Sequence, residues 1–537
     1  MNMRIQHFLL AASLVSLPAI AQETYENARI SGEDLNGTAR YVGMGGALEA
    51  LGADISTMGS NPAGIGLFRH SNASISGGLI IQGKGNEFAN GNKTNASFDQ
   101  AGFVYSTRTR KDSYLNFGFN YHKGKNFNFI LNAANSLNGS SQNRQSYLKG
   151  LIGNEASGGF SVGQNKQGEY FGYVDDKSTY TALTYSTVDY LYWNTMIPDA
   201  KDGKFYTYDA DAYQFDRSNT GYISNYDFNI SGNIHDKVFL GITFGVKDVH
   251  YKGYSEYHEL LSNGGGSVTL ADNRRITGSG FDVTAGIIVR PVQNSPFRIG
   301  AYVKTPTWFD LTTENYTNIA NNSTEGGTYD KGSITNSYDF KIWTPWKFGV
   351  SLGHTIDNYF AFGLTYEYED YSAINTRIND DSYIDYYYGD LYQSTSADQF
   401  MNNHTEKALK GVSTLKLGAE VKPIDNLAVR FGYNYVGPKY SSSAQKDSGL
   451  MSYGSSYASA TDFTNWKSTN RFTIGLGYIV DKFSVDLAYQ YSTQKGEFYP
   501  FSAMSVNDGG QTYANVPTMT KVQNDRSQLL MTLGYHF

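Results

Sequence analysis

Few residues of this chain have the types and spacing that catalysis or metal binding requires. The 537 residues include no cysteine, which excludes disulfides, thiolate ligands and a cysteine nucleophile. The nine histidines are dispersed, and His250 with His258 lacks the further ligands of a metal or haem site. No Gly-x-Ser-x-Gly nucleophile motif occurs. We therefore predict a protein that is not an enzyme and that holds no metal and no cofactor.

Two binding chemistries are also disfavoured. Gly45-Gly46 has no preceding strand and no following Lys-Ser/Thr pair, so it does not match a nucleotide-binding loop. The net charge of −7 argues against nucleic acid, whose phosphates require a basic surface. The remaining classes depend on the elements that make up most of the chain.

From about residue 70 onward, apolar and polar residues alternate with period two, which predicts strands whose two faces meet different solvents. One apolar face consists of Phe483, Val485, Leu487, Tyr489 and Tyr491, and the opposite face of Ser484, Asp486, Ala488, Gln490 and Ser492. A lysine or arginine facing lipid at mid-depth costs roughly 2–4 kcal/mol, so the charged face must meet a wet interior. We interpret four carboxylates as solvated charges of that interior: Glu367, Glu369, Glu420 and Asp486.

A soluble β-sandwich also alternates, but its apolar face would be buried in a core. The pattern of connections favours a transmembrane barrel instead, because short turns and long loops alternate along the chain. The tight turns are Thr109–Asp112, Ile234–Lys237, Thr355–Asn358, Pro423–Asn426 and Val480–Lys482. The longer polar stretches lie near 259–272, 319–333, 377–407, 438–465 and 496–522. An outer-membrane barrel has short periplasmic turns and long extracellular loops.

Aromatic residues support the same interpretation. Tyrosine and tryptophan cluster toward strand ends, where an amphipathic ring suits a membrane interface. Examples are Tyr251, Tyr254, Tyr257, Trp308, Trp343, Trp346, Tyr366, Tyr368 and Tyr371. The final residues alternate up to Phe537, and a terminal phenylalanine resembles the insertion signal of Gram-negative outer-membrane barrels.

The alternation predicts an all-β fold, a 14-stranded antiparallel transmembrane β-barrel. The expected strands are 70–83, 95–108, 114–131, 219–233, 238–257, 275–291, 297–313, 335–354, 359–373, 409–423, 427–437, 467–480, 483–495 and 523–537. The chain is too short for a 22-stranded transporter with a plug. No run of about 18 apolar residues follows residue 22, so membrane-spanning helices are not expected.

The N-terminal part divides in two. Residues 1–21 combine a basic start, an apolar stretch and the small-residue site Ala19-Ile20-Ala21, which predicts a secretory signal peptide rather than a buried helix. Residues 22–69 are the main non-strand segment on the periplasmic side, and we expect them to occupy the barrel lumen as a small, partly helical hatch. Ala47, Leu48, Ala50 and Leu51 suggest one short helix, and Asp54 is expected to cap a second that runs through Gly59.

The segment Asn61-Pro62-Ala63-Gly64 ends this hatch. Asn61 is pushed toward an extended conformation by the proline that follows it, and Gly64 is expected to supply backbone freedom before the first strand. On the residues alone, the segment is a structural turn that starts the barrel, and that role is compatible with a gate.

Met44-Gly45-Gly46-Ala47 followed by Asn61-Pro62-Ala63-Gly64-Ile65 resembles the N-terminal hatch of the FadL/TodX/OmpP1 family of outer-membrane transporters for hydrophobic compounds. Arg298–Trp308 and Thr344–Lys347 resemble the middle strands of that family, and the resemblance covers essentially the whole mature chain. It implies a hatch that blocks the lumen and shifts on ligand binding, and a substrate that leaves sideways through the wall near strand 3. The implied gate residues are Met44, Met58, Asn61, Pro62, Ala63 and Gly64. The chain departs from the family at Met58-Gly59-Ser60, where the family often has aromatic residues.

The connection between the third and fourth strands, about 134–218, is too long to be a passive loop. Its apolar residues suggest an extracellular groove that collects a hydrophobic ligand, formed by Tyr185, Leu191, Trp193, Met196 and Ile197. The alternative is that these residues pack the loop as a lid on the barrel.

Strand 3 is the expected place of a lateral opening. Lys123-Gly124-Lys125 interrupts an alternation that otherwise keeps its phase, and the resemblance places an opening of the wall near this strand. Gly118 and Gly124 are the candidate positions, and a harmless bulge is the alternative.

We therefore predict a monomeric barrel of the cell outer membrane that transports hydrophobic small molecules, such as long-chain fatty acids, by passive diffusion. Its expected partners are that ligand and lipid, and we do not expect it to bind nucleic acid. The alternative is that the same Bacteroidota-type FadL-like fold serves as a protein-interacting subunit or shuttle, with envelope proteins as partners, in a secretion or assembly complex.

Overall fold

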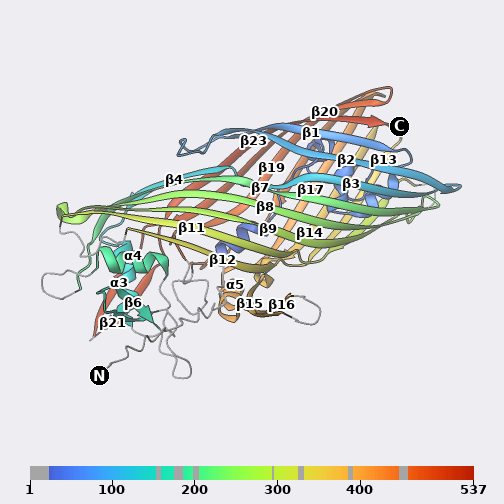
Figure 1. Cartoon of the computed structure of the whole chain (residues 1–537). Coiled ribbons are helices and arrows are strands. Elements are labelled where there is room, and N and C mark those ends of the chain that lie inside the picture. The colour runs from blue at the N-terminus through green and yellow to red at the C-terminus, as the bar shows by residue number, and fades with distance from the viewer. Residues whose placement is uncertain are drawn as a thin grey trace, which may run out of the picture.

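The computed structural model describes residues 23–152, 159–173, 186–197, 205–292, 295–324, 332–384, 391–446, 458–508 and 510–537. Antiparallel strands pair around a ring that closes where β1 (Asn72–Gln82) meets β23 (Thr520–His536) (Figure 1). Several wall strands are interrupted and carry two labels each. Counting each such pair as one strand, the ring contains fourteen strands, which confirms the predicted number and order.

The wall continues from β1 in chain order. Its members are β2 (Thr94–Arg110), β3 (Ser113–Asn126) with β4 (Phe129–Ser136), β7 (Ala210–Ile234), β8 (Val238–Leu261), β9 (Gly266–Val289), β10 (Arg298–Lys304) with β11 (Trp308–Ser323), β12 (Ser333–Trp343) with β13 (Lys347–Ile356), β14 (Phe360–Asp370) with β15 (Asn375–Ile384), β17 (Gly411–Ile424), β18 (Leu427–Val436), β19 (Phe463–Val480) and β20 (Phe483–Tyr499). The last of these pairs with β23.

The strands on one side of the barrel are longer than the sequence pattern indicates. We expected the fourth strand to begin at residue 219 and the sixth at 275, but β7 begins at Ala210 and β9 at Gly266. The physical reason is that the distal halves stand beyond the apolar belt, where no lipid demands strict alternation.

An apolar belt surrounds the half of the barrel nearest the short turns. Large hydrophobic side chains point outward there, as Phe483 (62% exposed), Val485 and Leu487 illustrate, whereas Asp486 and Gln490 of the same strand are buried inside. The predicted orientation of the two faces is therefore confirmed. In the described part of the chain, no helix has the length and apolar character needed to cross a membrane.

The predicted aromatic belt is only partly correct. Trp308, Trp346, Tyr366 and Tyr368 are exposed on the outer surface, but Tyr251, Tyr257 and Tyr371 are buried on the inner one. Beyond the belt the interior contains aromatic clusters as well, so an aromatic residue near a strand end does not reveal which face it occupies.

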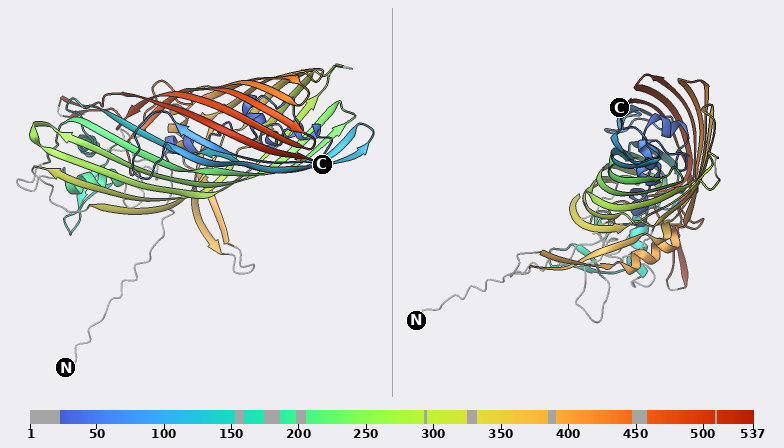
Figure 2. Two further views of the ribbon diagram at one scale, coloured as in Figure 1. Left: turned by 90° about the horizontal axis from the view of Figure 1, so that it is seen from above. Right: turned by 90° about the vertical axis from the view of Figure 1, so that its right-hand side faces the viewer.

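Smaller elements lie at the long-loop end and inside the ring (Figure 2). At the long-loop end are α3 (Gln142–Ile152), β5 (Ser161–Gln164), β6 (Tyr170–Tyr173), α4 (Thr187–Thr195), η4 (Ser262–Gly264), β21 (Met504–Asp508) and β22 (Gln511–Asn515). On one side are η5 (Tyr371–Ala373), β16 (Leu391–Ala397) and α5 (Gln399–Ala408). Inside the ring are α1 (Thr24–Ile30), α2 (Ala39–Gly43), η1 (Ile55–Gly59) and η2 (Pro62–Leu67).

Candidate functional site

The segment 23–71 lies inside the barrel and contacts wall strands on several sides. Helix α2 packs against β18, β19, β20 and β23, whereas η2 packs against β7, β8 and β9. Most of the segment is buried, and Figure 2 shows it enclosed by the ring. The predicted capping of a second short helix is confirmed, since the Asp54 carboxylate accepts from Ser56 N at 2.9 Å. The predicted helix at 47–51 is wrong, because these residues form turns around glycines with positive φ, such as Gly46 and Gly52.

Asn61 and Pro62 join this segment to the wall. Asn61 has the expected extended backbone, and its side chain accepts from Ala63 N at 3.2 Å and donates to the Glu49 carbonyl at 3.0 Å. Ser231 of β7 donates to the Pro62 carbonyl at 2.7 Å. The Asn61 side chain also lies so close to Gly286 that a Cβ there would overlap it. The segment is therefore both a helix cap and a contact with the wall.

Gly64 has a different role from the one expected. Its φ is not positive, and a Cβ at this position would lie 2.6 Å from the Thr57 hydroxyl. Glycine is needed at position 64 because η1 packs closely against η2 there, and not because the backbone adopts a conformation that only glycine favours.

Met58 and Gly118, which we predicted for two different sites, lie together. The methyl group of fully buried Met58 fills the space where a Cβ of Gly118 would be. Met44 also lies against a glycine, since its carbonyl oxygen and its methyl group both lie close to where a Cβ of Gly418 on β17 would be. Both methionines thus pack against glycines of the inner wall.

Buried ion pairs also hold the segment. Lys416 of β17 lies 2.9 Å from Glu49 and 2.7 Å from Glu367, and Arg40 lies 3.5 Å from Glu420. Asp486 pairs with Arg430, and Glu369 pairs with Lys347. The prediction that these four wall carboxylates are solvated charges is therefore wrong, because lysines and arginines of other wall strands pair with each of them, and Arg40 of the inner segment adds a second cation at Glu420.

Glu33 is held by three lysines. Its carboxylate lies 2.7 Å from Lys247, 3.0 Å from Lys304 and 3.1 Å from Lys347. Burial alone would raise the pKa of Glu33, but the three ammonium groups outweigh burial and hold that pKa well below its ordinary value.

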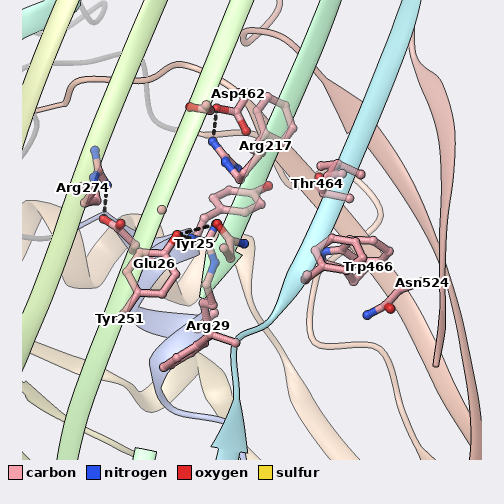
Figure 3. A pocket seen from close by; sticks show the side chains of 18 of the residues that line it. Tyr25, Glu26, Arg29, Arg217, Tyr251, Arg274, Asp462, Thr464, Trp466 and Asn524 are labelled. Carbon is pink, nitrogen blue, oxygen red and sulfur yellow. Dashed lines mark hydrogen bonds and ion pairs between the residues drawn. The ribbon is translucent and has the colours of Figure 1, made fainter. Parts of the chain in front are cut away.

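A cavity of about 240 Å³ lies between α1 and the wall on the long-loop side of the segment (Figure 3). Aromatic rings form much of its lining: Tyr25, Phe127, Phe129, Tyr251, Tyr440, Phe463 and Trp466. Two ion pairs border it, Arg217 with Asp462 at 2.6 Å and Arg274 with Glu26. The cavity therefore combines apolar surfaces with charged ones.

One side of this region carries more cations than anions. Asp34 is the carboxylate nearest to Arg471 and Arg526, at 3.9 and 3.8 Å. Lys125 and Lys439 donate to backbone carbonyls of the N-terminal segment, at 3.1 and 3.2 Å, and no described carboxylate lies within ion-pair distance of either. An anionic group of a ligand would be favoured here.

The wall is incomplete beside the cavity. The ladder between β2 and β3 ends at the pair Gln100 and His122, and the register with β7 shifts at Gly124. After residues 127–128, β4 continues on β7 only, so among the described strands its other edge has no partner. The side chain of Gln82 takes the place of a neighbouring strand: Ile130 N donates to it at 2.9 Å, and it donates to the Ile130 carbonyl at 2.7 Å.

The residues predicted to form an outer groove lie elsewhere. Leu191, Trp193, Met196 and Ile197 are between 0 and 3% exposed, in a hydrophobic core at the long-loop end that includes Phe160. This is the packing expected of a lid. Tyr185 lies outside the described residues, as does the expected signal peptide.

Sequence reasoning missed the cation-rich side of the cavity. The cations that line it come from β3, the loop after β18 and β23, which are far apart along the chain and meet only when the ring closes; Arg471 of β19 lies close by, near Asp34. The one available signal was Lys123-Gly124-Lys125, which interrupts the alternation at the edge of this site.

No family model matches this sequence, and no curated protein matches it. Among solved structures, the chain is similar to the toluene transporter TbuX of Ralstonia pickettii, with 13% identity and a TM-score of 0.46, over 94% of this chain and 99% of that one. It is similar to the toluene transporter TodX of Pseudomonas putida, with 9% identity and a TM-score of 0.47, over 94% and 100% of the two chains. A FadL homologue of Pseudomonas aeruginosa is similar at 11% identity and a TM-score of 0.47, again over 94% and 100%.

Proposed function

We propose that this protein is a passive outer-membrane transporter for hydrophobic small molecules that carry an anionic group, such as long-chain fatty acids. The observation that carries the proposal is the cavity beside α1, which has aromatic walls and a cation-rich side. Aromatic and aliphatic surfaces stabilise an apolar chain by about 25 cal/mol per Å² buried, and the cations would attract a carboxylate. The outward apolar belt supports placement of a monomeric barrel in the outer membrane of a Gram-negative bacterium.

In this proposal residues 22–69 are the hatch, residues 70–537 form the barrel, and residues 1–21 are removed as a signal peptide. Asn61, Pro62, Ala63, Gly64, Met44 and Met58 act as the gate. Five of them form contacts between hatch and wall that a moving hatch must break, and Gly64 packs η1 against η2 within the hatch. The ligand leaves sideways between β2 and β4, next to Gly124, where the described wall lacks a ladder. Gly118 keeps room for Met58 rather than lining that opening.

The test uses the purified barrel in vesicles and two probes, a fluorescent long-chain fatty acid and an uncharged aromatic compound. We expect K125Q/K439Q to bind the fatty acid about tenfold or more weakly, a loss of roughly 1.4 kcal/mol. Binding of the uncharged probe should change little. The control is K467Q, which removes an exposed lysine that is paired with Glu497 outside the cavity.

Transport itself is measured as entry of the fatty acid into vesicles. N61A should change the rate of uptake, because it removes the bonds to Ala63 and Glu49 that hold the gate. Uptake no faster than in protein-free vesicles would refute the proposal.

A second function, as a protein-interacting subunit, is favoured by one observation. The hairpin of β15 and β16 projects from the side of the barrel, away from the ring (Figure 2). If it docks an envelope protein, gentle solubilisation should recover a stable complex, and deletion of residues 378–396 should release the partner without unfolding the barrel. Recovery of a solitary monomer would exclude this function.

A further inference from the structure

A second cavity, of about 450 Å³, lies at the opposite end of the barrel, among the short turns. The hatch turn Leu51–Ala53 forms one side of it together with Arg40 and Leu67, and the inner wall and its short turns form most of the rest. Its charged lining contains five cations, Arg40, Arg69, Arg290, Arg298 and Lys422, and three carboxylates, Asp236, Asp357 and Glu420. This cavity is separate from the cavity beside α1 and from the gap in the wall at β4.

The three carboxylates of this cavity either pair with other cations or are exposed at its edge. Asp236 pairs with Arg69 at 2.5 Å. Glu420 is shared between Arg40, at 3.5 Å, and Arg430, at 2.6 Å. Asp357 is exposed at the tip of a turn. Within the described residues, no carboxylate therefore lies within 4 Å of Arg290 or Arg298.

Both of these arginines have donor capacity to spare. The Nε atoms of Arg290 and Arg298 are buried, and in the described part of the protein neither has a hydrogen-bond partner. Arg298 donates through Nη1 to the Leu51 carbonyl at 2.6 Å, while the Arg290 guanidinium lies 5.5 Å from the centre of the Phe239 ring. A buried charged donor without an acceptor is costly, so such a site gains most from a ligand that supplies several oxygens.

We propose that this cavity binds an oxyanion of the phosphate class, held by Arg290 and Arg298 and supported by Arg40 and Lys422. The planar guanidinium fork matches the oxygens of a phosphate group, and two such forks around one cavity favour a ligand with three or more acceptor oxygens. The phosphate can be free in the periplasm or belong to a phospholipid headgroup. This site is independent of the proposed transport function, because its residues do not line the cavity beside α1.

The test is calorimetric titration of the full barrel in uncharged detergent, with inorganic phosphate in one series and short-chain phosphatidylglycerol in the other. Ionic strength is matched with sodium chloride in every series, because screening alone weakens charge attraction. We expect saturable binding that falls about tenfold or more in R290Q/R298Q. The control R110Q removes an exposed arginine at the same end of the barrel that does not line the cavity.

The single variant R290Q separates loss of binding from misfolding. In the described residues Arg290 makes no side-chain hydrogen bond to the hatch, and Arg298 keeps its bond to Leu51 in this variant. It should weaken binding in the same direction while the barrel stays folded. Saturation by phosphate alone assigns the site to a soluble anion, and saturation by the lipid assigns it to a headgroup. Absence of saturation in both series, or equal affinity in R290Q/R298Q, would overturn the proposal.

Discussion

The ammonium group of Lys416 lies 2.9 Å from the carboxylate of Glu49, and both side chains are buried. The same ammonium lies 2.7 Å from Glu367 of β14, so one wall lysine joins the inner segment 23–71 to two neighbouring strands. Tyr41 and Thr365 complete the cluster by donating to Glu49 at 3.0 and 2.8 Å. The position of the segment 23–71 is therefore set by a network and not by packing alone.

Substitution K416M should destabilise this network by about 3–5 kcal/mol, because it leaves two buried carboxylates without their shared cation. The free energy of unfolding in urea, followed in lipid vesicles, measures the loss. K482Q, which removes an exposed lysine in a turn, is the control and should change stability by less than about 0.5 kcal/mol. Equal stability of K416M and the wild type would show that the pairs contribute nothing.

G286A should displace Asn61, because an added Cβ would overlap its side-chain oxygen. Overpacking of this kind typically costs about 1–3 kcal/mol, and here it would displace the segment 23–71 more than it would disturb the strand ladder. We expect faster leakage of a small solute from vesicles that contain the variant. The matched control is G232A, since no atom lies within 4 Å of a Cβ at that position. Similar leakage through both variants would contradict a specific contact with Asn61.

Anchoring of Glu33 should depend on pH in one direction only. Three lysines hold the pKa of Glu33 below its ordinary value. The ionised carboxylate therefore stabilises the folded state fully at pH values above the ordinary carboxyl pKa, and this stabilisation is lost as the pH falls through the lowered pKa. Wild type and E33Q should therefore differ most in their resistance to proteolysis of residues 23–71 near neutral pH, and this difference should shrink in strong acid. A difference that grows on acidification would reverse the assigned sign.

Q82L should open the wall beside β4. The substitution removes both hydrogen bonds between the Gln82 side chain and the backbone of Ile130. A buried backbone group left without a partner costs roughly 1–3 kcal/mol. Hydrogen exchange at the Ile130 amide should accelerate accordingly, while amides of β8 keep their protection. Unchanged exchange at Ile130 would mean that water or another group satisfies the edge.

The sequence alone was sufficient for the barrel and for the direction in which its strands face. The reason is that lipid outside and water inside impose a strict alternation, as at Phe483 and Asp486, that few other environments demand. Asn61 was also predictable in its local conformation, because the effect of Pro62 on the preceding residue is steric and needs no tertiary context.

The interior was less predictable. Tyr251 and Tyr371 were assigned to the membrane interface but face the lumen, since rings near strand ends satisfy either environment. The partners of Glu49 and Glu33 come from strands that are hundreds of residues away, and no spacing in the sequence brings them together. The short helix expected at 47–51 failed because glycines on both sides favour tight turns over a helix.

The unequal height of the wall has an energetic consequence. Strands β7, β8 and β9 contain 24–25 residues each, whereas about 9–11 residues suffice to cross a bilayer. Roughly half of each strand therefore extends beyond the lipid, and its inner face packs into the long-loop core, as Phe215, Tyr257 and Leu270 do. The hydrophobic core around Trp193 at the long-loop end must therefore stabilise these distal strand halves, which the membrane does not contact.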